Sequence, residues 1–154
     1  MYLIAKKPSL QVSLISHEGT LLSTSLSLNT SGFSLISGDI SPALLKQIKE
    51  WLHLYAEKKE GATLPLDYCL FPPFTHSVLT QLRSIPFGQT TTYGTIANAL
   101  NNKKAGRAVG NACGLNPFPL FIPCHRVLAA GNLLGGFSCG IDIKKKLLTF
   151  EHST

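Results

Sequence analysis

Residues 92–113 read TYGTIANALNNKKAGRAVGNAC and predict two short helices joined by a basic turn. Apolar residues recur at helical spacing from about Thr92 to Leu100 and again from about Ala105 to Cys113. The turn between them, residues 101–104, is polar and contains two lysines. This pattern is typical of a helix-turn-helix, whose second helix is the recognition helix.

The second of these helices is rich in Gly and Ala, although each Gly costs roughly 1 kcal/mol relative to Ala inside a helix. Its composition therefore indicates close approach to something bulky. The backbone of DNA is one candidate. Tight packing against another helix of the same chain is the alternative.

The flanking sequence extends this unit. Thr75 is expected to cap a preceding helix, which Pro86 ends. Three prolines keep residues 116–123 out of helical conformation, residues 127–134 have the pattern of a β-hairpin, and a last helix is expected from about Ile141, with lysines on a solvated face. Helices followed by a hairpin predict a winged helix.

The first forty residues alternate between apolar and polar side chains, which is the period of strands. Leu22, Thr24, Leu26 and Leu28 share one parity, and turn residues separate three such runs, so a small antiparallel meander is expected. Ser41 and Pro42 then open a helix that should run to Gly61. The chain is thus expected to be α+β, with an N-terminal domain over residues 1–66, a linker within 61–73, and a winged-helix domain over 72–154.

Charge separates the two halves of the 154 residues. Residues 1–71 carry six lysines and six acids, whereas the remainder carries eight basic residues against two acids, which accounts for the net charge of +6. Such asymmetry indicates a polyanionic partner, with a merely solubilising basic surface as the alternative. No apolar run reaches the length of a membrane span, and the N-terminus lacks a signal peptide, so a cytoplasmic protein with no membrane partner is expected.

The four cysteines form no C-x-x-C pair, so neither a disulfide framework nor a metal site is expected. A cysteine doing chemistry must then act singly as a nucleophile. Cys124 is the candidate, because His125 and Arg126 follow it and nearby positive charge lowers a thiol pKa. Neighbours in extended chain point to opposite faces, however, so adjacency alone is weak evidence.

The string Pro-Cys-His-Arg-Val at 123–127, preceded by Asn-Pro-Phe-Pro at 116–119, resembles the active-site signature of the O6-alkylguanine-DNA alkyltransferases. The resemblance spans roughly residues 72–151, and its further matching positions are Thr75, residues 85–88, Tyr93, residues 107–110 and Glu151. It implies a ribonuclease-H-like domain for the N-terminal half. It also implies direct transfer of an alkyl group from guanine O6 to the protein, with no cofactor.

For the chemistry, the resemblance makes Cys124 the acceptor. His125 would be the base, acting through a water, and Glu151 would orient it in a relay like a catalytic triad. Tyr93 would donate to the departing base. Without the resemblance, Glu151 would be taken as a surface acid and Tyr93 as an ordinary aromatic residue at the start of a helix.

For DNA, the resemblance implies a monomer that binds the minor groove of a duplex carrying O6-alkylguanine or O4-alkylthymine. The base must be extruded, and Arg107 would fill the gap while Ala108 permits close approach. Ser138 would bond near O6, backbone groups around Val127 would contact the base, and Asn116 would brace the turn before the active-site strand.

One departure from the family pattern concerns the pocket. Where many members have two glycines after the serine, this chain reads Ser138-Cys139-Gly140, which is expected to add a side chain beside the alkyl group. Three other classes of protein compete with this interpretation. A non-catalytic relative of the family, which only binds lesions, has its cysteine replaced, and Cys124 argues against that class. A winged-helix regulator would not need the Cys-His pair, and a cysteine hydrolase would leave the basic helix-turn-helix unexplained.

Overall fold

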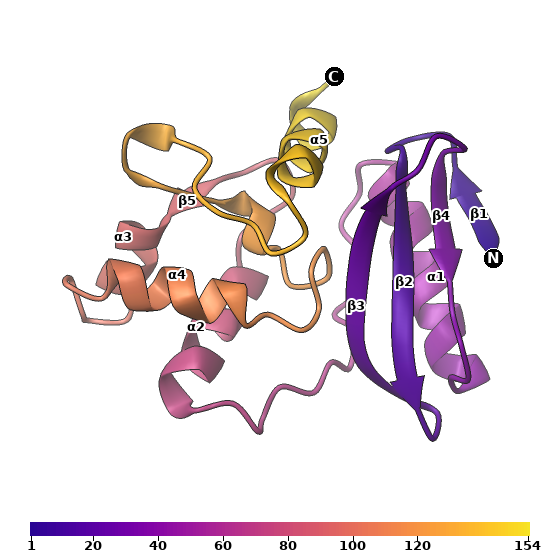
Figure 1. Ribbon diagram of the computed structural model, residues 1–154, viewed down its shortest axis with the longest axis horizontal. Coiled ribbons are helices and arrows are strands. Elements are labelled where there is room, and N and C mark those ends of the chain that lie inside the picture. The colour runs from indigo at the N-terminus through magenta and orange to yellow at the C-terminus, as the bar shows by residue number, and fades with distance from the viewer.

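The computed structural model describes residues 1–154 and shows an α+β fold in two adjacent halves (Figure 1). The N-terminal half is a four-stranded sheet with one helix, α1, on one face. Its strands are β1 (Tyr2–Ala5), β2 (Leu10–His17), β3 (Thr20–Leu28) and β4 (Phe33–Ile36), in the order β1-β4-β2-β3.

The expected meander is wrong, because β4 pairs parallel with β2 instead of antiparallel with β3. The reason lies at the other edge of β3, which the C-terminal half occupies. The Thr24 amide donates to the carbonyl of Pro117 at 2.8 Å, and the Thr24 hydroxyl donates to the carbonyl of Pro119 at 3.2 Å. With that edge covered, β4 crosses to the free edge of β2 and also pairs with β1.

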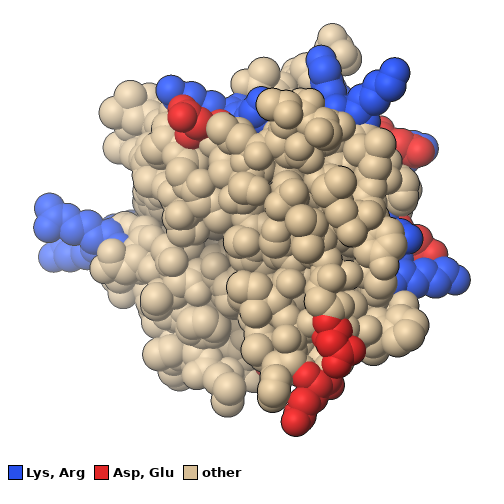
Figure 2. All heavy atoms as spheres, turned by 45° about the vertical axis from the view of Figure 1, so that its right-hand side comes forward, with Lys and Arg blue, Asp and Glu red and all other residues tan.

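A bulge in β3 also changes the predicted parity. Ile15 of β2 pairs with Ser23 and Ser16 pairs with Leu21, so Leu22 is the extra residue. Leu21, Thr24 and Leu26 are therefore buried, whereas Leu22 is exposed. The outer surface of the sheet carries serines and aliphatic residues, and Figure 2, which brings this side forward, shows charged side chains mainly around its rim.

Helix α1 (Pro42–Ala56) begins as predicted, since the Ser41 hydroxyl accepts a hydrogen bond from the Leu44 amide at 3.3 Å. It ends five residues before Gly61, where Lys58 adopts a left-handed conformation. Ile48, Leu52 and Tyr55 face the core. Trp51 is half-buried and stacks on Tyr55, with 5.4 Å between the ring centroids.

The C-terminal half confirms the helices around the basic turn. They are α3 (Tyr93–Ala99), capped by Thr92, and α4 (Gly106–Gly114). The preceding helix α2 (Pro73–Arg83) begins at Pro73, so Thr75 lies inside its first turn and is not its cap. The remaining elements are β5 (Thr91–Thr92), the 3-10 helices η1 (Cys124–Arg126) and η2 (Ala130–Asn132), β6 (Val127–Leu128) and α5 (Ile141–His152).

The predicted hairpin over residues 127–134 is reduced to one bridge, between Ala129 and Leu133. Strand β6 instead pairs parallel with β5, so its edge is taken by a segment more than thirty residues earlier in the chain. Helix η2 then fills the loop, with Gly131 and Asn132 at positive φ.

The lysines of α5 also differ from expectation. Lys145 and Lys146 are exposed, but Lys144 is fully buried. Its ammonium donates to the carbonyls of Val127 at 2.6 Å and Gly136 at 3.1 Å, which satisfies the charge inside the protein.

No helix in the structure is both long and apolar enough to cross a bilayer.

One apolar core extends through both halves. At its edge, the backbone of Gly61 packs directly against the ring of Trp51. A Cβ added at Gly61 would lie 2.5 Å from Cδ1 of the Trp51 ring, which packs against Tyr55 and, edge-on at 4.9 Å, against Phe121. We expect Gly61→Ala to lower the free energy of unfolding by about 1–3 kcal/mol through overpacking, as measured by urea denaturation.

Gly114→Ala is the matched control, because a Cβ there meets no atom within 4 Å. That variant should be neutral or stabilising by up to about 1 kcal/mol, since Ala is the better helix former. Equal effects of the two substitutions would contradict a tight contact at Gly61.

Candidate active site

Cys124 lies at the start of η1 and is only 4% exposed. It lines a cavity of about 550 Å³ that opens between α3, α4 and the loop after η2. This cavity brings Cys124 together with three predicted residues, Tyr93, Arg107 and Ser138. The other lining residues are Gly94, Gly106, Gly110, Cys113, Gly114, Ala129, Ala130, Gly136 and Phe137.

Asn116 holds the Cys124 segment in place. Its side-chain amide donates to the carbonyl of Ile122 at 2.8 Å and to Sγ of Cys124 at 3.2 Å, and its oxygen accepts from the Phe118 amide at 2.9 Å. The bracing position predicted for Asn116 is therefore what the geometry shows, with a direct contact to the sulfur in addition.

The residues that follow Cys124 in the sequence do not lower the pKa of its thiol, so the thiol is protonated in the resting protein. Burial raises its pKa to about 11, and the Asn116 hydrogen bond and the charge of Lys144 oppose this rise without cancelling it. Both His125 and Arg126 direct their side chains to Glu151 instead. At pH 7 only about one molecule in ten thousand would carry a thiolate.

His125 and Glu151 form a buried pair, as predicted from the resemblance. Nε2 of His125 lies 2.6 Å from Oε1 of Glu151, and both side chains are fully shielded from solvent. Glu151, in α5, is thus an interior residue and not a surface acid. The Phe137 ring lies edge-on to the His125 ring, with 6.5 Å between centroids, and also lines the Cys124 cavity.

Arg126 keeps the Glu151 carboxylate charged. Its Nε and Nη2 donate to the two carboxylate oxygens at 2.9 and 3.0 Å. Burial by itself would raise the pKa of Glu151, but the hydrogen bonds and charges of His125 and Arg126 lower this pKa to about 2. Because the guanidinium is always protonated, this pairing holds even when His125 is neutral.

The charge on Glu151 determines which nitrogen of His125 carries the proton. A carboxylate only accepts hydrogen bonds, so Nε2 must be the donor. Burial lowers the pKa of His125, which keeps the imidazole neutral near pH 7 and leaves a lone pair on Nδ1. Nδ1 is buried and has no hydrogen-bond partner in the protein, so it is free to accept a proton.

Two further contacts to Glu151 were not predicted from the sequence. The Tyr55 hydroxyl, from α1 of the N-terminal half, donates to Oε1 at 2.8 Å, and the Gly88 amide donates to Oε2 at 3.2 Å. In the sequence, Tyr55 has only the helical spacing of a core residue, and Arg126 is recognisable only as a basic residue. No local pattern reveals that either meets an acid far along the chain.

Ala108 and Val127, two further predicted residues, do not themselves line the cavity. Arg107 and Ala108 are exposed on α4, whose opposite face buries Val109, Ala112 and Cys113. A Cβ at Gly106 or Gly114 would meet no atom within 4 Å, so internal packing does not explain these glycines. Val127 is buried, and its carbonyl accepts from Lys144.

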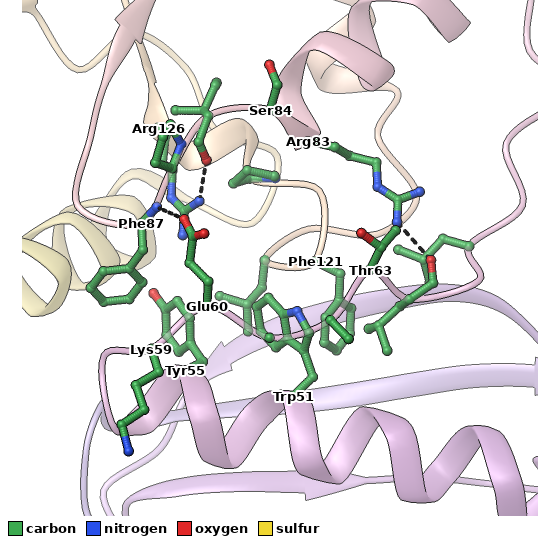
Figure 3. A pocket seen from close by; sticks show the side chains of 18 residues that line it. Trp51, Tyr55, Lys59, Glu60, Thr63, Arg83, Ser84, Phe87, Phe121 and Arg126 are labelled. Carbon is green, nitrogen blue, oxygen red and sulfur yellow. Dashed lines mark hydrogen bonds between the residues drawn. The ribbon is translucent and has the colours of Figure 1, made fainter.

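Cys139 is not among the residues that line the cavity, although it lies near enough to Cys124 to contribute to the raised pKa of that thiol. A second cavity, of about 250 Å³, lies between the two halves and is lined by Tyr55, Glu60, Phe87 and Arg126 among others (Figure 3). Two of its lining residues, Tyr55 and Arg126, donate hydrogen bonds to Glu151. No group of three or more His, Cys, Asp or Glu side chains is placed to hold a metal ion.

Comparison with known proteins finds relatives that match between half and three quarters of this chain. A probable methylated-DNA–protein-cysteine methyltransferase of Acanthamoeba polyphaga mimivirus is 43% identical over 116 residues, 75% of this chain and 76% of that protein. The methylated-DNA–protein-cysteine methyltransferase of Methanosarcina acetivorans is 49% identical over 80 residues, 52% of this chain and 51% of that protein. This chain therefore spans about half the length of the second relative.

Solved structures match the whole fold. The crystal structure of Mycobacterium tuberculosis OGT in complex with DNA superposes with a TM-score of 0.66 at 26% identity, covering 92% of each chain. The sequence model described as "6-O-methylguanine DNA methyltransferase, DNA binding domain" matches residues 73–153, more than half of the 154 residues. On this evidence, and with Cys124, His125 and Glu151 assembled as described, the chain belongs to the 6-O-methylguanine DNA methyltransferase family.

Proposed function

We propose that this protein repairs O6-alkylguanine, and also O4-alkylthymine, in duplex DNA by transferring the alkyl group irreversibly to its own Cys124. The observation that carries the proposal is the buried thiol at a cavity, next in the chain to a neutral histidine whose Nδ1 is free and whose Nε2 is held by an ionised carboxylate. The names of the relatives, which are methylated-DNA–protein-cysteine methyltransferases, support it.

The reaction starts from a protonated thiol. A water between the two side chains passes the Cys124 proton to Nδ1 of His125, and Glu151 stabilises the imidazolium that forms. The sulfur then attacks the alkyl carbon, the S–C bond forms, and the C–O6 bond breaks. The electron pair stays on the base, and Tyr93, whose burial raises its pKa, remains protonated to donate a hydrogen bond or a proton to it.

Binding to DNA is assigned to the exposed face of α4. This face carries Arg107 and Ala108 and follows the basic turn at 101–104. Its small residues would let the minor groove approach closely, and Arg107, at the cavity, is placed to fill the space left by an extruded base. Ser138 and the backbone near Val127 would contact that base.

At the level of domains, we propose a monomer with a ribonuclease-H-like unit over residues 1–66 and a winged-helix unit over 72–154. The antiparallel β2–β3 pair with α1 supports the first, and the α3–α4 pair supports the second. The wing would be the short loop around η2.

The first functional prediction is that each molecule accepts one methyl group. Because a thioether is not hydrolysed readily, incubation with excess O6-methylguanine duplex should raise the intact mass by one methylene unit and then stop. Peptide mapping should place the methyl group on Cys124. Cys124→Ala should bind the duplex and gain no mass.

Cys113 serves as the control, because its thiol lines the same cavity. Burial raises the pKa of Cys113 to about 12. Cys113→Ala should still accept one methyl group. Sustained turnover, or methylation at Cys113, would refute Cys124 as the acceptor.

The pH dependence of transfer tests the relay. In the wild type, His125 accepts the proton, so the single-turnover rate should be nearly constant from about pH 7 to 9. In His125→Ala the thiolate must form by titration, so the rate should rise about tenfold per pH unit toward the thiol pKa of about 11. The loss at pH 7 should be about 10²–10⁴-fold.

Rates of this variant would be measured by rapid quench at saturating DNA, so that weaker binding does not contribute. If wild type and variant keep a constant rate ratio from pH 7 to 9, His125 supports the fold and is not the base.

Base extrusion is tested at Arg107. Arg107→Ala should lose transfer from duplex DNA far more than from free O6-benzylguanine, since the free base has no stacking to lose. Duplex affinity should fall modestly, with the salt slope reduced by about one. Lys103→Ala, at the exposed turn, is a control that removes a cation without a predicted role in extrusion. Equal losses on both substrates for Arg107→Ala would place Arg107 in the pocket or the fold.

A further inference from the structure

The N-terminal half contributes one side chain to the active-site network, Tyr55 of α1. Its hydroxyl donates to Oε1 of Glu151 at 2.8 Å, across 96 positions of sequence, and the side chain is 1% exposed. The sheet and α1 are otherwise remote from the cavity, because none of their residues lines it. Tyr55 is therefore the residue through which this half hydrogen-bonds directly to Glu151.

Four aromatic rings fix the orientation of Tyr55. Two come from its own half, Trp51 stacked at 5.4 Å and Phe33 at 6.0 Å between centroids. Two come from the C-terminal half, Phe87 edge-on at 5.4 Å and Phe150 at 5.6 Å. In Figure 3, Tyr55 extends from α1 toward Phe87 and Arg126. A ring held on all sides presents its hydroxyl to one place only.

The Tyr55 hydroxyl and Nε2 of His125 donate to the same acceptor atom, Oε1 of Glu151. Oε1 of Glu151 accepts from Tyr55, from Nε2 of His125 at 2.6 Å and from Nη2 of Arg126 at 3.0 Å. Burial, and then the charge of Glu151, raise the pKa of Tyr55 well above its ordinary value. The phenol thus stays protonated and acts as a donor at every pH at which the protein works.

We propose that Tyr55 is a positioning residue for alkyl transfer, which holds Oε1 of Glu151 and limits how strongly this carboxylate attracts a proton to His125. The inference rests on the relay proposed above. It gives the N-terminal half a part in the chemistry, because Tyr55 keeps the imidazole in the neutral form that can accept the thiol proton.

The sign of the effect follows from the groups around the pair. His125 faces Glu151 and Lys144 from α5 and Arg126 from η1, and Glu151 also faces Tyr55 from α1. Glu151 favours the imidazolium, whereas Arg126 and Lys144 disfavour it. A donor on Oε1 weakens the hold of Glu151 on the His125 proton. Removing that donor should raise the pKa of His125, and Tyr55→Phe does so without changing any charge.

The experiment measures the His125 pKa by NMR titration of histidine-labelled protein, with the signal assigned by its absence from His125→Ala. We expect Tyr55→Phe to raise this pKa by about half a pH unit to one unit, because a unit corresponds to a tenfold change in the protonation equilibrium. The acid limb of the single-turnover rate should move upward by the same amount, while the plateau at higher pH changes by less than about threefold. In a His125→Ala background, Tyr55→Phe should leave the pH profile unchanged.

Two controls separate this role from packing. Tyr68→Phe removes the same atom from a half-buried tyrosine whose hydroxyl lies 3.3 Å from that of Thr80, and Trp51→Phe disturbs the aromatic stack but keeps the Tyr55 hydroxyl. Neither should move the His125 pKa. The inference is overturned if Tyr55→Phe leaves that pKa in place or lowers it, or if Trp51→Phe shifts it equally. If His125→Ala itself keeps the wild-type pH profile, the relay is wrong and the inference falls with it, a result distinct from an unmoved His125 signal in Tyr55→Phe.

Discussion

The buried carboxylate of Glu151 is the group around which the active site is built. It accepts five hydrogen bonds, from Tyr55, Gly88, His125 and two nitrogens of Arg126. An isolated charge could not be buried there, and removing one partner of such an ion pair costs about 3–5 kcal/mol. The donors come from α1, from the loop after α2 and from η1, so the same charge that orients the histidine also holds these segments together.

This arrangement explains how a buried thiol can be both stable and reactive. Low polarity around Cys124 raises its pKa to about 11, so the resting protein presents a thiol to other electrophiles. In the proposed relay, reactivity depends on passing the thiol proton to His125, whose Nδ1 is buried and has no hydrogen-bond partner in the protein. Cys113 shares the cavity and is equally shielded, but no hydrogen bond like that from Asn116 to Cys124 reaches its sulfur. Hydrogen-bond contacts, and not resting ionisation, distinguish the two thiols.

Polar contacts join the two halves as much as the apolar core does. The backbone and hydroxyl of Thr24 bond to the segment before Cys124, Lys58 bonds to Ser153 after α5, and Tyr55 bonds to Glu151. All three residues belong to the N-terminal half, and each bonds to a segment that contains or adjoins Cys124 or Glu151.

Local patterns in the sequence were enough to predict α1, α3, α4 and α5, because capping residues and helical spacing act within a few positions. The resemblance, which spans roughly residues 72–151, likewise pointed to Cys124, His125 and Glu151 as the candidate site. Only the tertiary structure determined that β4 pairs with β2, that Lys144 is buried, that the Cys124 pKa rises and that Tyr55 reaches Glu151. Each of these depends on which edge is free or which group is removed from water, and burial and edge contacts are set by residues far away in the chain.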